Sequence, residues 1–263
     1  MVAPAVLWPT AAGIVFLAIG PITGRRQLLA VGPAFVASAL AAFGMEHFVA
    51  ARSIMPAVPS WMPGRLFWIY FVGIALLAAA LSLALQRCVR LTATLLGTMF
   101  LLFVLLIHLR NAVIRPELLL WVVLVRDLAF GGGAWALAGG RLAVVGRWWI
   151  VAAVLFFAVV YFLHPEIAPG VPLVKLTPAW VPLHLLWGYP MGAALLLAGL
   201  AALVNRHSRL AATVLAITVT LSVVLIYIPI MALGPTLEAM NYVFDTLLFA
   251  GTIWLLAQSS PAN

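Results

Sequence analysis

One stretch of the chain occurs twice. Residues 61–108 recur as residues 180–227, shifted by 119 positions without a gap, and 21 of the 48 aligned residues are identical. The identical pairs include Trp61/Trp180, Pro63/Pro182, Trp68/Trp187, Tyr70/Tyr189, Gly73/Gly192, Arg87/Arg206, Arg90/Arg209 and Thr94/Thr213. Tryptophan, proline and arginine fall in register, so composition bias does not account for the match. The pattern indicates that one supersecondary unit was duplicated.

The composition predicts that lipid is the solvent for most of this chain. Of its 263 residues, 66% are hydrophobic and only 8% are charged, whereas soluble domains carry about 25% charged residues. So few charges cannot cover a globular surface. At roughly 20 residues per span, the length allows eight or nine transmembrane helices.

The apolar runs predict an all-α membrane protein with nine spans. These lie at roughly 4–21, 28–50, 66–86, 91–112, 118–139, 148–163, 183–204, 210–232 and 242–258. We expect an extra N-terminal helix in residues 1–27 and two four-helix repeats, 28–140 and 141–263. An even number of spans per repeat gives both repeats the same orientation, which makes them parallel repeats.

The basic residues predict orientation rather than nucleic-acid binding. The net charge is +8, but the 14 basic residues fall in short gaps between apolar runs. Eight lie in the odd gaps, starting with Arg25 and Arg26, and five in the even gaps, which predicts an outer N-terminus and an inner C-terminus.

The first apolar run has no preceding Lys or Arg, unlike a secretory signal. The single cysteine, Cys88, excludes an intrachain disulfide.

Proline-rich segments precede both copies of the repeat. Residues 55–63 and 169–182 contain several prolines each, and proline fixes φ and removes a backbone donor. Neither segment can be helical throughout. Two interpretations stand: connectors that lie on the membrane surface, or lids over an outward-facing cavity.

Ionisable and amide side chains within the spans form the candidate site, because such groups need a partner or a purpose in a membrane. The candidates are Glu46, His47, His108, Asn111, Arg126 and Asp127. The first four lie near the outer ends of their helices, and His108 and Asn111 share a face one turn apart. Arg126 and Asp127 lie roughly 12–14 Å into their span. We expect these groups to converge in the outer half of the first repeat.

Pairing within this set is predicted from helix geometry. Neighbours on a helix point about 100° apart, so Arg126 and Asp127 are expected to find partners on other helices, with Glu46 as the partner of Arg126. A structural ion pair and a functional polar site are both compatible with this pattern. The histidines could hydrogen-bond backbone or each other, bind a quinone-like head group, or, less favoured, ligate a metal or haem.

The second repeat keeps little of this set. His108 corresponds to Tyr227 and Asn111 to Ile230, while one deleted residue would align Asp127 with Asp245 and Arg126 with Phe244. The nearest candidate counterpart of Glu46 and His47 is His164. This asymmetry predicts one site, in the first repeat. The glycine run 131–133 lacks the strand and Lys-Ser/Thr of a phosphate loop, which favours close helix packing.

Several motifs of the first repeat are similar to one known family. They are Gly44-Met45-Glu46-His47, the turn Arg87 to Arg90, the helix end with His108 and Asn111, and the run from Arg126-Asp127-Leu128-Ala129 to Gly131-Gly132-Gly133-Ala134. This pattern resembles the DoxX-like family of prokaryotic four-helix membrane proteins. The resemblance implies a four-helix bundle, the bacterial cytoplasmic membrane and an association with respiratory or quinone-linked redox systems. This chain departs from the family pattern by its second copy, its leading helix and its lack of paired cysteines.

Three functions remain open from the sequence. The first is a redox-associated membrane protein that handles a quinone and contacts other membrane redox subunits. The second is a transporter or carrier for a small or lipid-like solute, favoured by the parallel repeat. The third is a structural subunit of a larger membrane complex. The sequence does not decide whether the protein is an enzyme, and it assigns no catalytic residue and no metal ligand.

Overall fold

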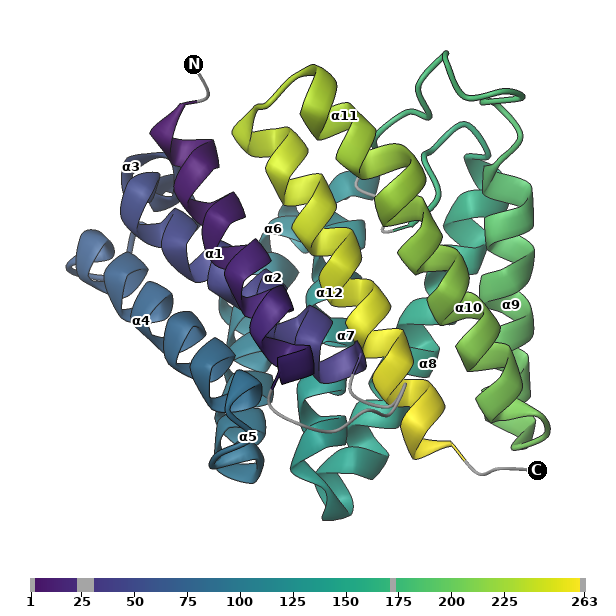
Figure 1. Cartoon of the computed structure of the whole chain (residues 1–263), viewed down its shortest axis with the longest axis horizontal. Coiled ribbons are helices and arrows are strands. Elements are labelled where there is room, and N and C mark those ends of the chain that lie inside the picture. Colours follow the sequence, from purple (N-terminus) through teal and green to yellow (C-terminus); the bar gives the residue numbers. More distant parts are fainter. Residues whose placement is uncertain (1–2, 23–30, 171–173, 261–263) are drawn as a thin grey trace.

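The computed structural model describes residues 3–22, 31–170 and 174–260. Figure 1 shows its helices running up and down a single bundle. The long elements are α1 (Pro4–Ile22), α2 (Val31–Val49), α4 (Arg65–Ala84), α5 (Val89–Phe103), α7 (Leu118–Ala138), α8 (Gly140–Leu163), α9 (Gly188–Val204), α10 (Ser208–Ser222) and α12 (Leu237–Ser259). The short ones are α3 (Ala51–Ile54), η2 (Met55–Ala57), η3 (Val104–His108), α6 (Leu109–Ile114), η4 (Val223–Tyr227) and α11 (Ile228–Leu233).

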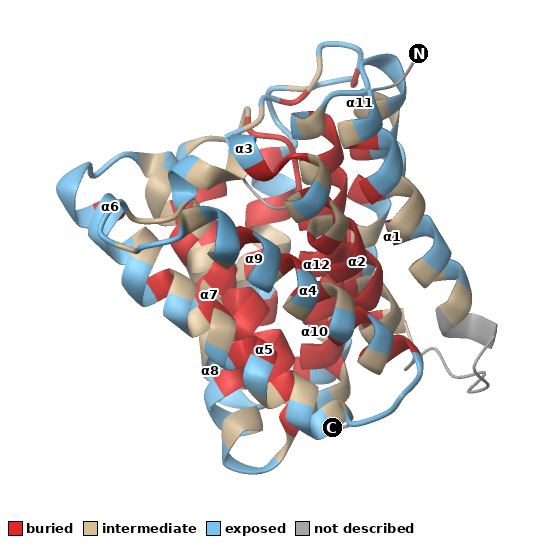
Figure 2. Ribbon diagram, turned by 90° about the vertical axis from the view of Figure 1, so that its left-hand side faces the viewer, coloured by how far each residue is buried: buried red, intermediate tan, exposed pale blue. Residues whose placement is uncertain are grey.

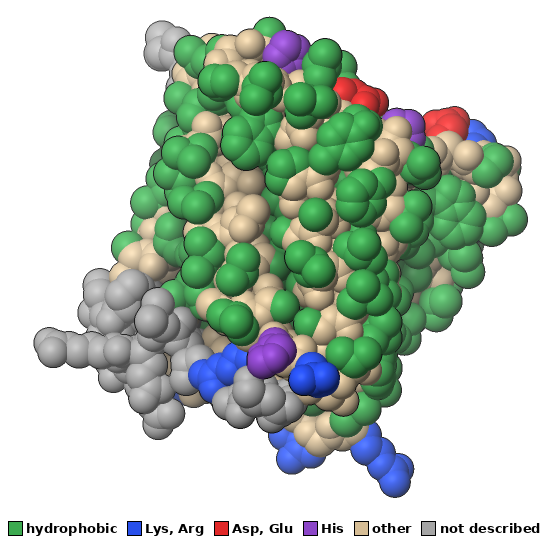
Figure 3. All heavy atoms as spheres, turned by 90° about the vertical axis from the view of Figure 1, so that its right-hand side faces the viewer, with side chains coloured by type: hydrophobic (Ala, Val, Ile, Leu, Met, Phe, Trp, Pro, Cys, Tyr) green, Lys and Arg blue, Asp and Glu red, His purple; other side chains and the backbone are tan. Residues whose placement is uncertain are grey.

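The helices confirm the prediction of an all-helical membrane protein. Seven helical segments of the described chain are long and apolar enough to cross a membrane, and α1 and α9 are apolar but shorter. In Figure 3, the face formed by α9 and α10 carries a broad apolar band, with its charged side chains near the two ends. Such a band matches a bundle whose sides contact lipid tails.

The boundaries of two helices differ from those predicted. Helix α8 begins at Gly140 rather than near 148, so that Arg141 and Arg147 lie in its first turns. The turn before it is only Gly139, whose φ of 77° is accessible to glycine without strain. Helix α9 begins at Gly188 rather than near 183, because residues 181–187 form turns.

The two ends of the bundle differ in charge. The connections α4–α5, α7–α8 and α9–α10 lie at the lower end in Figure 1. The charged residues in these connections and in the first helical turn after each are all basic: Arg87, Arg90, Arg141, Arg206 and Arg209. The upper end carries α3, α6, α11 and residues 164–170 and 174–187. Cations and glutamates mix there, as with Lys175 and Glu166. Arg25 and Arg26, on which the predicted orientation also relies, lie outside the described residues.

The matching sequence stretches share local backbone features at the same offset of 119 positions. Each contains a five-residue π-helical turn, η3 and η4. Left-handed backbone occurs at Gln86 and Cys88 and again at Asn205 and His207. A π-turn holds one more residue than an α-turn and changes the direction of the side chains that follow.

The central pair of helices joins the two halves of the bundle. Helices α7 and α12 pack on each other, α7 also packs on α5 and α8, and α12 packs on α10 and α2. The last helix of each half therefore packs on the first long helix of the other half. Figure 2 shows that buried residues concentrate in this centre, and helix α12 is almost wholly buried.

Glycines bring these helices together. A Cβ on Gly132 would lie 2.6 Å from the carbonyl oxygen of Gly146, and one on Gly251 would lie 3.0 Å from that of Gly32. Backbones approach this closely only where side chains are small. The contact at Gly132 agrees with the interpretation of the glycine run as a packing surface.

Candidate functional site

Helix α7 places Arg126 at the centre of a buried ionic cluster. Arg126 Nη1 donates to Asp245 Oδ2 at 2.7 Å, and Arg126 Nε donates to Asp127 Oδ1 at 3.2 Å. The guanidinium carbon also lies 5.6 Å from the centre of the Phe130 ring. Arginine presents several donors in one plane, so it can hold two carboxylates at once.

The prediction of Glu46 as the partner of Arg126 is therefore wrong. The flexible guanidinium side chain reaches back to the adjacent Asp127, which overcomes the 100° separation between neighbouring residues. The second carboxylate, Asp245, comes from helix α12 in the other half of the chain.

The helix boundaries also change the expected register. Helices α7 and α12 begin at Leu118 and Leu237, two residues after Pro116 and Pro235, so the offset of 119 continues without a deletion. Arg126 then corresponds to Asp245, and Asp127 to Thr246. The strongest ion pair of the cluster joins equivalent positions of the two halves.

His108 closes the cluster on one side. Its Nε2 lies 3.0 Å from Asp127 Oδ2, and His108 is the last residue of the π-turn η3. The side chain of His108 is 20% exposed and that of Asp127 is 8% exposed. Among the described residues, the other ring nitrogen, Nδ1, has no hydrogen-bond partner. One imidazole nitrogen is thus held by a carboxylate while the other stays available.

Glu46 joins the cluster indirectly. Asn241 Nδ2 donates to Glu46 Oε1 at 3.2 Å, and Glu46 is buried. Asn241 lies one turn before Asp245 on helix α12, on the same face. Sequence reasoning missed Asn241, although a neutral amide in an apolar helix one turn from a buried aspartate was a usable signal.

Two predicted site residues lie apart from these contacts. His47 Nδ1 bonds to the Phe43 carbonyl oxygen, 2.8 Å away on its own helix. Asn111 is exposed. It lines a polar pocket of about 240 Å³ together with Arg65, Arg110 and the segment 56–60. His108 bonds to Asp127 and does not line this pocket, so the two side chains lie in different surroundings despite their i, i+3 spacing.

The cluster contains more acids than bases. Three carboxyl groups, from Glu46, Asp127 and Asp245, accompany one guanidinium and one imidazole. With all three carboxyls ionised and the imidazole neutral, the cluster carries a net charge of −2, so neutrality requires two added positive charges, as protons or as bound cations. Uncompensated charge is costly in a medium of low dielectric constant, so the arrangement favours uptake of a proton or a cation. Within the described residues, no group of three or more His, Cys, Asp or Glu could hold a metal ion.

The second half has a different set of residues in place of His108 and Asp127. Tyr227 ends the π-turn η4 and is fully buried, and its hydroxyl donates to the Ala168 carbonyl oxygen at 3.2 Å. The Tyr161 hydroxyl donates to the same oxygen at 2.8 Å. Ala168 belongs to the long segment 164–187, whose backbone is pinned by the bond from Ala168 N to Lys175 O, 2.7 Å long. This part of the segment is inserted into the bundle rather than lying on its surface.

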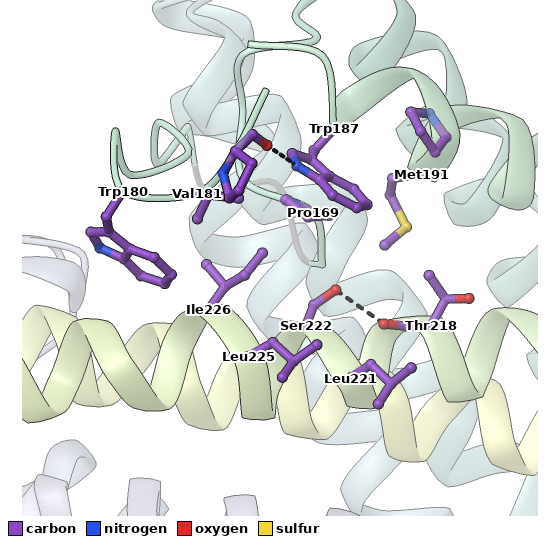
Figure 4. Close-up of a pocket in the computed structure, with 12 residues that line it drawn as sticks. Pro169, Trp180, Val181, Trp187, Met191, Thr218, Leu221, Ser222, Leu225 and Ile226 are labelled. Carbon is purple, nitrogen blue, oxygen red and sulfur yellow. Dashed lines mark hydrogen bonds between the residues drawn. The ribbon is translucent and has the colours of Figure 1, made fainter. Parts of the chain in front are cut away.

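An apolar pocket lies between this segment, α9, α10 and η4. It has a volume of about 420 Å³. Figure 4 shows Trp180 and Trp187 above it, facing Leu221 of α10 and Leu225 of η4 across the hollow. Trp187 Nε1 donates to the Pro182 carbonyl at 2.7 Å, and the first half repeats this bond from Trp68 to Pro63 at 3.1 Å. The pocket suits an aliphatic chain, and its lining includes no member of the ionic cluster.

Comparison with known proteins gives one partial match. A family model described as a domain of unknown function, DUF8561, matches residues 36–118. The match runs from α2 to the first residue of α7 and stops before Arg126 and Asp127. No curated protein and no solved structure matches the chain significantly. The similarity therefore concerns less than half of the chain and carries no activity with it.

Proposed function

We propose that this integral membrane protein binds the head group of a lipid-soluble quinone or quinol at the ionic cluster, where His108 and Asp127 exchange a proton with it. The observation that carries the proposal is the 3.0 Å bond between His108 and Asp127, which leaves the second imidazole nitrogen free on a partly exposed side chain. Quinones dissolve in the hydrocarbon that surrounds such a bundle.

The proton chemistry follows from the geometry of the pair. Asp127 holds one ring nitrogen of His108 and stabilises the imidazolium that forms when the other nitrogen accepts a proton, as carboxylate–histidine pairs do in general base catalysis. Arg126 keeps Asp127 in place through its own ion pair. Oxidation of a quinol releases two protons and two electrons. In this proposal His108 accepts the protons one after the other and passes each to water at the upper end of the bundle, and the electrons pass to a redox centre on a partner subunit.

The architecture and location belong to the same proposal. The shared π-turns and the reciprocal packing of α7 and α12 support two parallel four-helix repeats, 28–140 and 141–263, preceded by a separate first helix in residues 1–27. The purely basic connections at the lower end support a cytoplasmic position for that end in a bacterial membrane, with the N-terminus outside. The resemblance to DoxX-like proteins is consistent with this placement.

Binding of decylubiquinone to the detergent-purified protein tests the proposal. We expect saturable quenching of tryptophan fluorescence, weakened about tenfold or more by His108→Ala and by Asp127→Asn. His164→Ala is the matched control, because His164 forms an exposed pair with Glu166 at 3.4 Å. Equal decylubiquinone affinity in the wild-type protein, in His108→Ala and in Asp127→Asn would contradict the proposal.

A second function is favoured by the position of the cluster between the two halves. The excess of carboxyl groups at a junction of parallel repeats fits a proton-coupled carrier. Proteoliposomes loaded with the pH dye pyranine would then show proton entry under an imposed membrane potential, and Asp245→Asn would slow it. If proton entry matched that of empty liposomes, the carrier hypothesis would lose its support. A purely structural subunit would show neither quinone binding nor proton movement.

A further inference from the structure

We infer that the head-group oxygen of the bound molecule lies between His47 and His108, in the position that the Ala168 carbonyl oxygen occupies between Tyr161 and Tyr227. The inference rests on the proposed function for the presence of a ligand. It adds where the ligand binds, which chemical group is recognised and a role for His47. It comes from comparing the two halves of the bundle.

His108 and Tyr227 occupy equivalent places. Each is the last residue of a π-turn, and the two positions differ by the offset of the repeated sequence. Both side chains also form a hydrogen bond to a group outside their own helix: His108 to Asp127 and Tyr227 to the Ala168 carbonyl oxygen.

His47 and Tyr161 are equivalent by packing. A Cβ added to Gly73 would lie 2.8 Å from the Cβ of His47. A Cβ added to Gly192 would lie 3.2 Å from the Cβ of Tyr161. Gly73 and Gly192 are themselves an identical pair in the repeat. This relation replaces the expected correspondence of His47 with His164.

In the second half, the chain itself fills the space between the two side chains. Both tyrosine hydroxyls donate to one backbone carbonyl, that of Ala168. At Gly170, an added Cβ would lie 2.8 Å from Thr246 Cγ2 and 2.9 Å from Tyr227 Cε2. The backbone of this segment therefore behaves like a bound ligand, with a carbonyl oxygen as its recognised group.

In the first half, among the described residues, no hydrogen bond joins His47 or His108 to the connection between α2 and α4, in contrast to the tyrosine bonds to Ala168. The equivalent connection, residues 50–64, is shorter and forms α3 and η2, with most of its side chains exposed or half-buried. His108 is 20% exposed, whereas Tyr227 is 1% exposed and Tyr161 is fully buried. A polar pocket of about 240 Å³ lies next to this site in sequence, because Ile107 lines it together with the segment 56–60 of that connection.

The replaced side chains suit an external carbonyl or hydroxyl group. Imidazole is shorter than phenol, so a histidine reaches less far than a tyrosine from the same backbone position. Among the described residues, His47 Nε2 and His108 Nδ1 lack hydrogen-bond partners, and each can donate or accept. Asp127 in place of Thr246 adds a charge that can support a protonated His108. A planar molecule that carries a carbonyl or hydroxyl oxygen, as quinones and quinols do, matches these groups.

The test is decylubiquinone affinity of the full-length protein with His47→Ala, His47→Gln and His108→Ala, measured beside the His164→Ala control. We expect about tenfold weaker binding for His47→Ala, as for a lost hydrogen bond. The glutamine variant, which keeps an N–H donor, should recover most of the affinity. Wild-type affinity in His47→Ala together with loss in His108→Ala would overturn this inference and leave the proposed function standing. Wild-type affinity in both His47→Ala and His108→Ala would contradict this inference and the proposed function together.

A second readout separates direct contact from a change in helix α2. Infrared difference spectra of decylubiquinone labelled with ¹³C at a ring carbonyl report the hydrogen bond to that oxygen directly. We expect the bound carbonyl stretch to lie below that of the free quinone and to move toward the free value in His47→Ala. An identical bound frequency in the wild-type and His47→Ala proteins would contradict the inference, whatever the affinities.

Discussion

The two halves of the bundle share matched π-turns and matched left-handed backbone positions, and they differ in the side chains around them. In the second half, Tyr161 and Tyr227 hold a carbonyl of the chain itself and are fully buried. In the first half, the equivalent histidines are partly exposed, and one of them is held by a carboxylate of the ionic cluster. The difference suggests that a duplicated unit can keep one site open for a ligand while the other is closed by a loop and serves stability.

The largest expected effect comes from removing the cation that joins the two halves. Arg126→Met leaves Asp127 and Asp245 buried without their partner, which typically costs about 3–5 kcal/mol of stability. Thermal unfolding in detergent measures it, with Arg52→Met as the control, because Arg52 is exposed in α3 at the upper end of the bundle in Figure 1. Recovery of part of the loss in the double variant Arg126→Met/Asp245→Asn would support the pairing, and an unchanged melting temperature in Arg126→Met would refute it.

The glycine contacts allow a direct comparison of the two junctions. Gly132→Ala puts a Cβ 2.6 Å from a backbone oxygen on α8, whereas Gly251→Ala, the equivalent change, puts one 3.0 Å from a backbone oxygen on α2. We expect a loss of about 1–3 kcal/mol for Gly132→Ala and less for Gly251→Ala. Melting temperatures provide the measurement, with Gly234→Ala as a control because nothing lies within 4 Å of its added Cβ. A larger stability loss for Gly251→Ala than for Gly132→Ala would contradict this prediction, because the closer contact would then not cause the larger loss.

The closed half should depend on its hydroxyl groups for stability rather than for binding. Tyr227→Phe removes the donor to Ala168 and is expected to cost about 1 kcal/mol, with decylubiquinone affinity unchanged. Differential scanning fluorimetry and fluorescence titration of the same sample measure the two effects. A loss of quinone affinity in this variant would place the ligand in the second half instead.

The smallest expected effect concerns the exposed pair in segment 164–187. His164 and Glu166 lie 3.4 Å apart, with side chains 43% and 38% exposed. Pairs of this kind contribute about 0–1 kcal/mol, so His164→Ala should shift the melting temperature by little. A large shift in melting temperature would mean that the His164–Glu166 pair, rather than the tyrosine hydrogen bonds to Ala168, keeps the segment inserted in the second half.

Much of the helical framework was predictable because apolar runs and prolines mark it. The nine predicted spans each contain a helix, and Arg126, Asp127 and His108 stood out as ionisable groups within spans. The partner of Arg126 was not predictable, since the choice between Glu46 and Asp245 depends on how α2, α7 and α12 are rotated about their axes. The alignment of α12 with α7 became clear only from the residues at which the two helices begin, Leu237 and Leu118.

The π-turns and the inserted loop explain most of the remaining differences. A π-turn leaves no clear mark in sequence, so η3 and η4 could not be anticipated from helical spacing. Prolines predicted that residues 169–182 are not helical, but they did not indicate that Ala168 and Gly170 would be buried. The part played by Tyr161 and Tyr227 follows from that burial.

The most direct test converts the open half into a copy of the closed one. The double variant His108→Tyr/Asp127→Thr gives the first half the residues found at the equivalent positions of the second. Equilibrium dialysis with decylubiquinone should give one bound molecule per wild-type chain and none per variant chain, while both proteins remain folded by circular dichroism. Two bound molecules per wild-type chain, or one retained in the variant, would contradict the claim that a single open site lies in the first half.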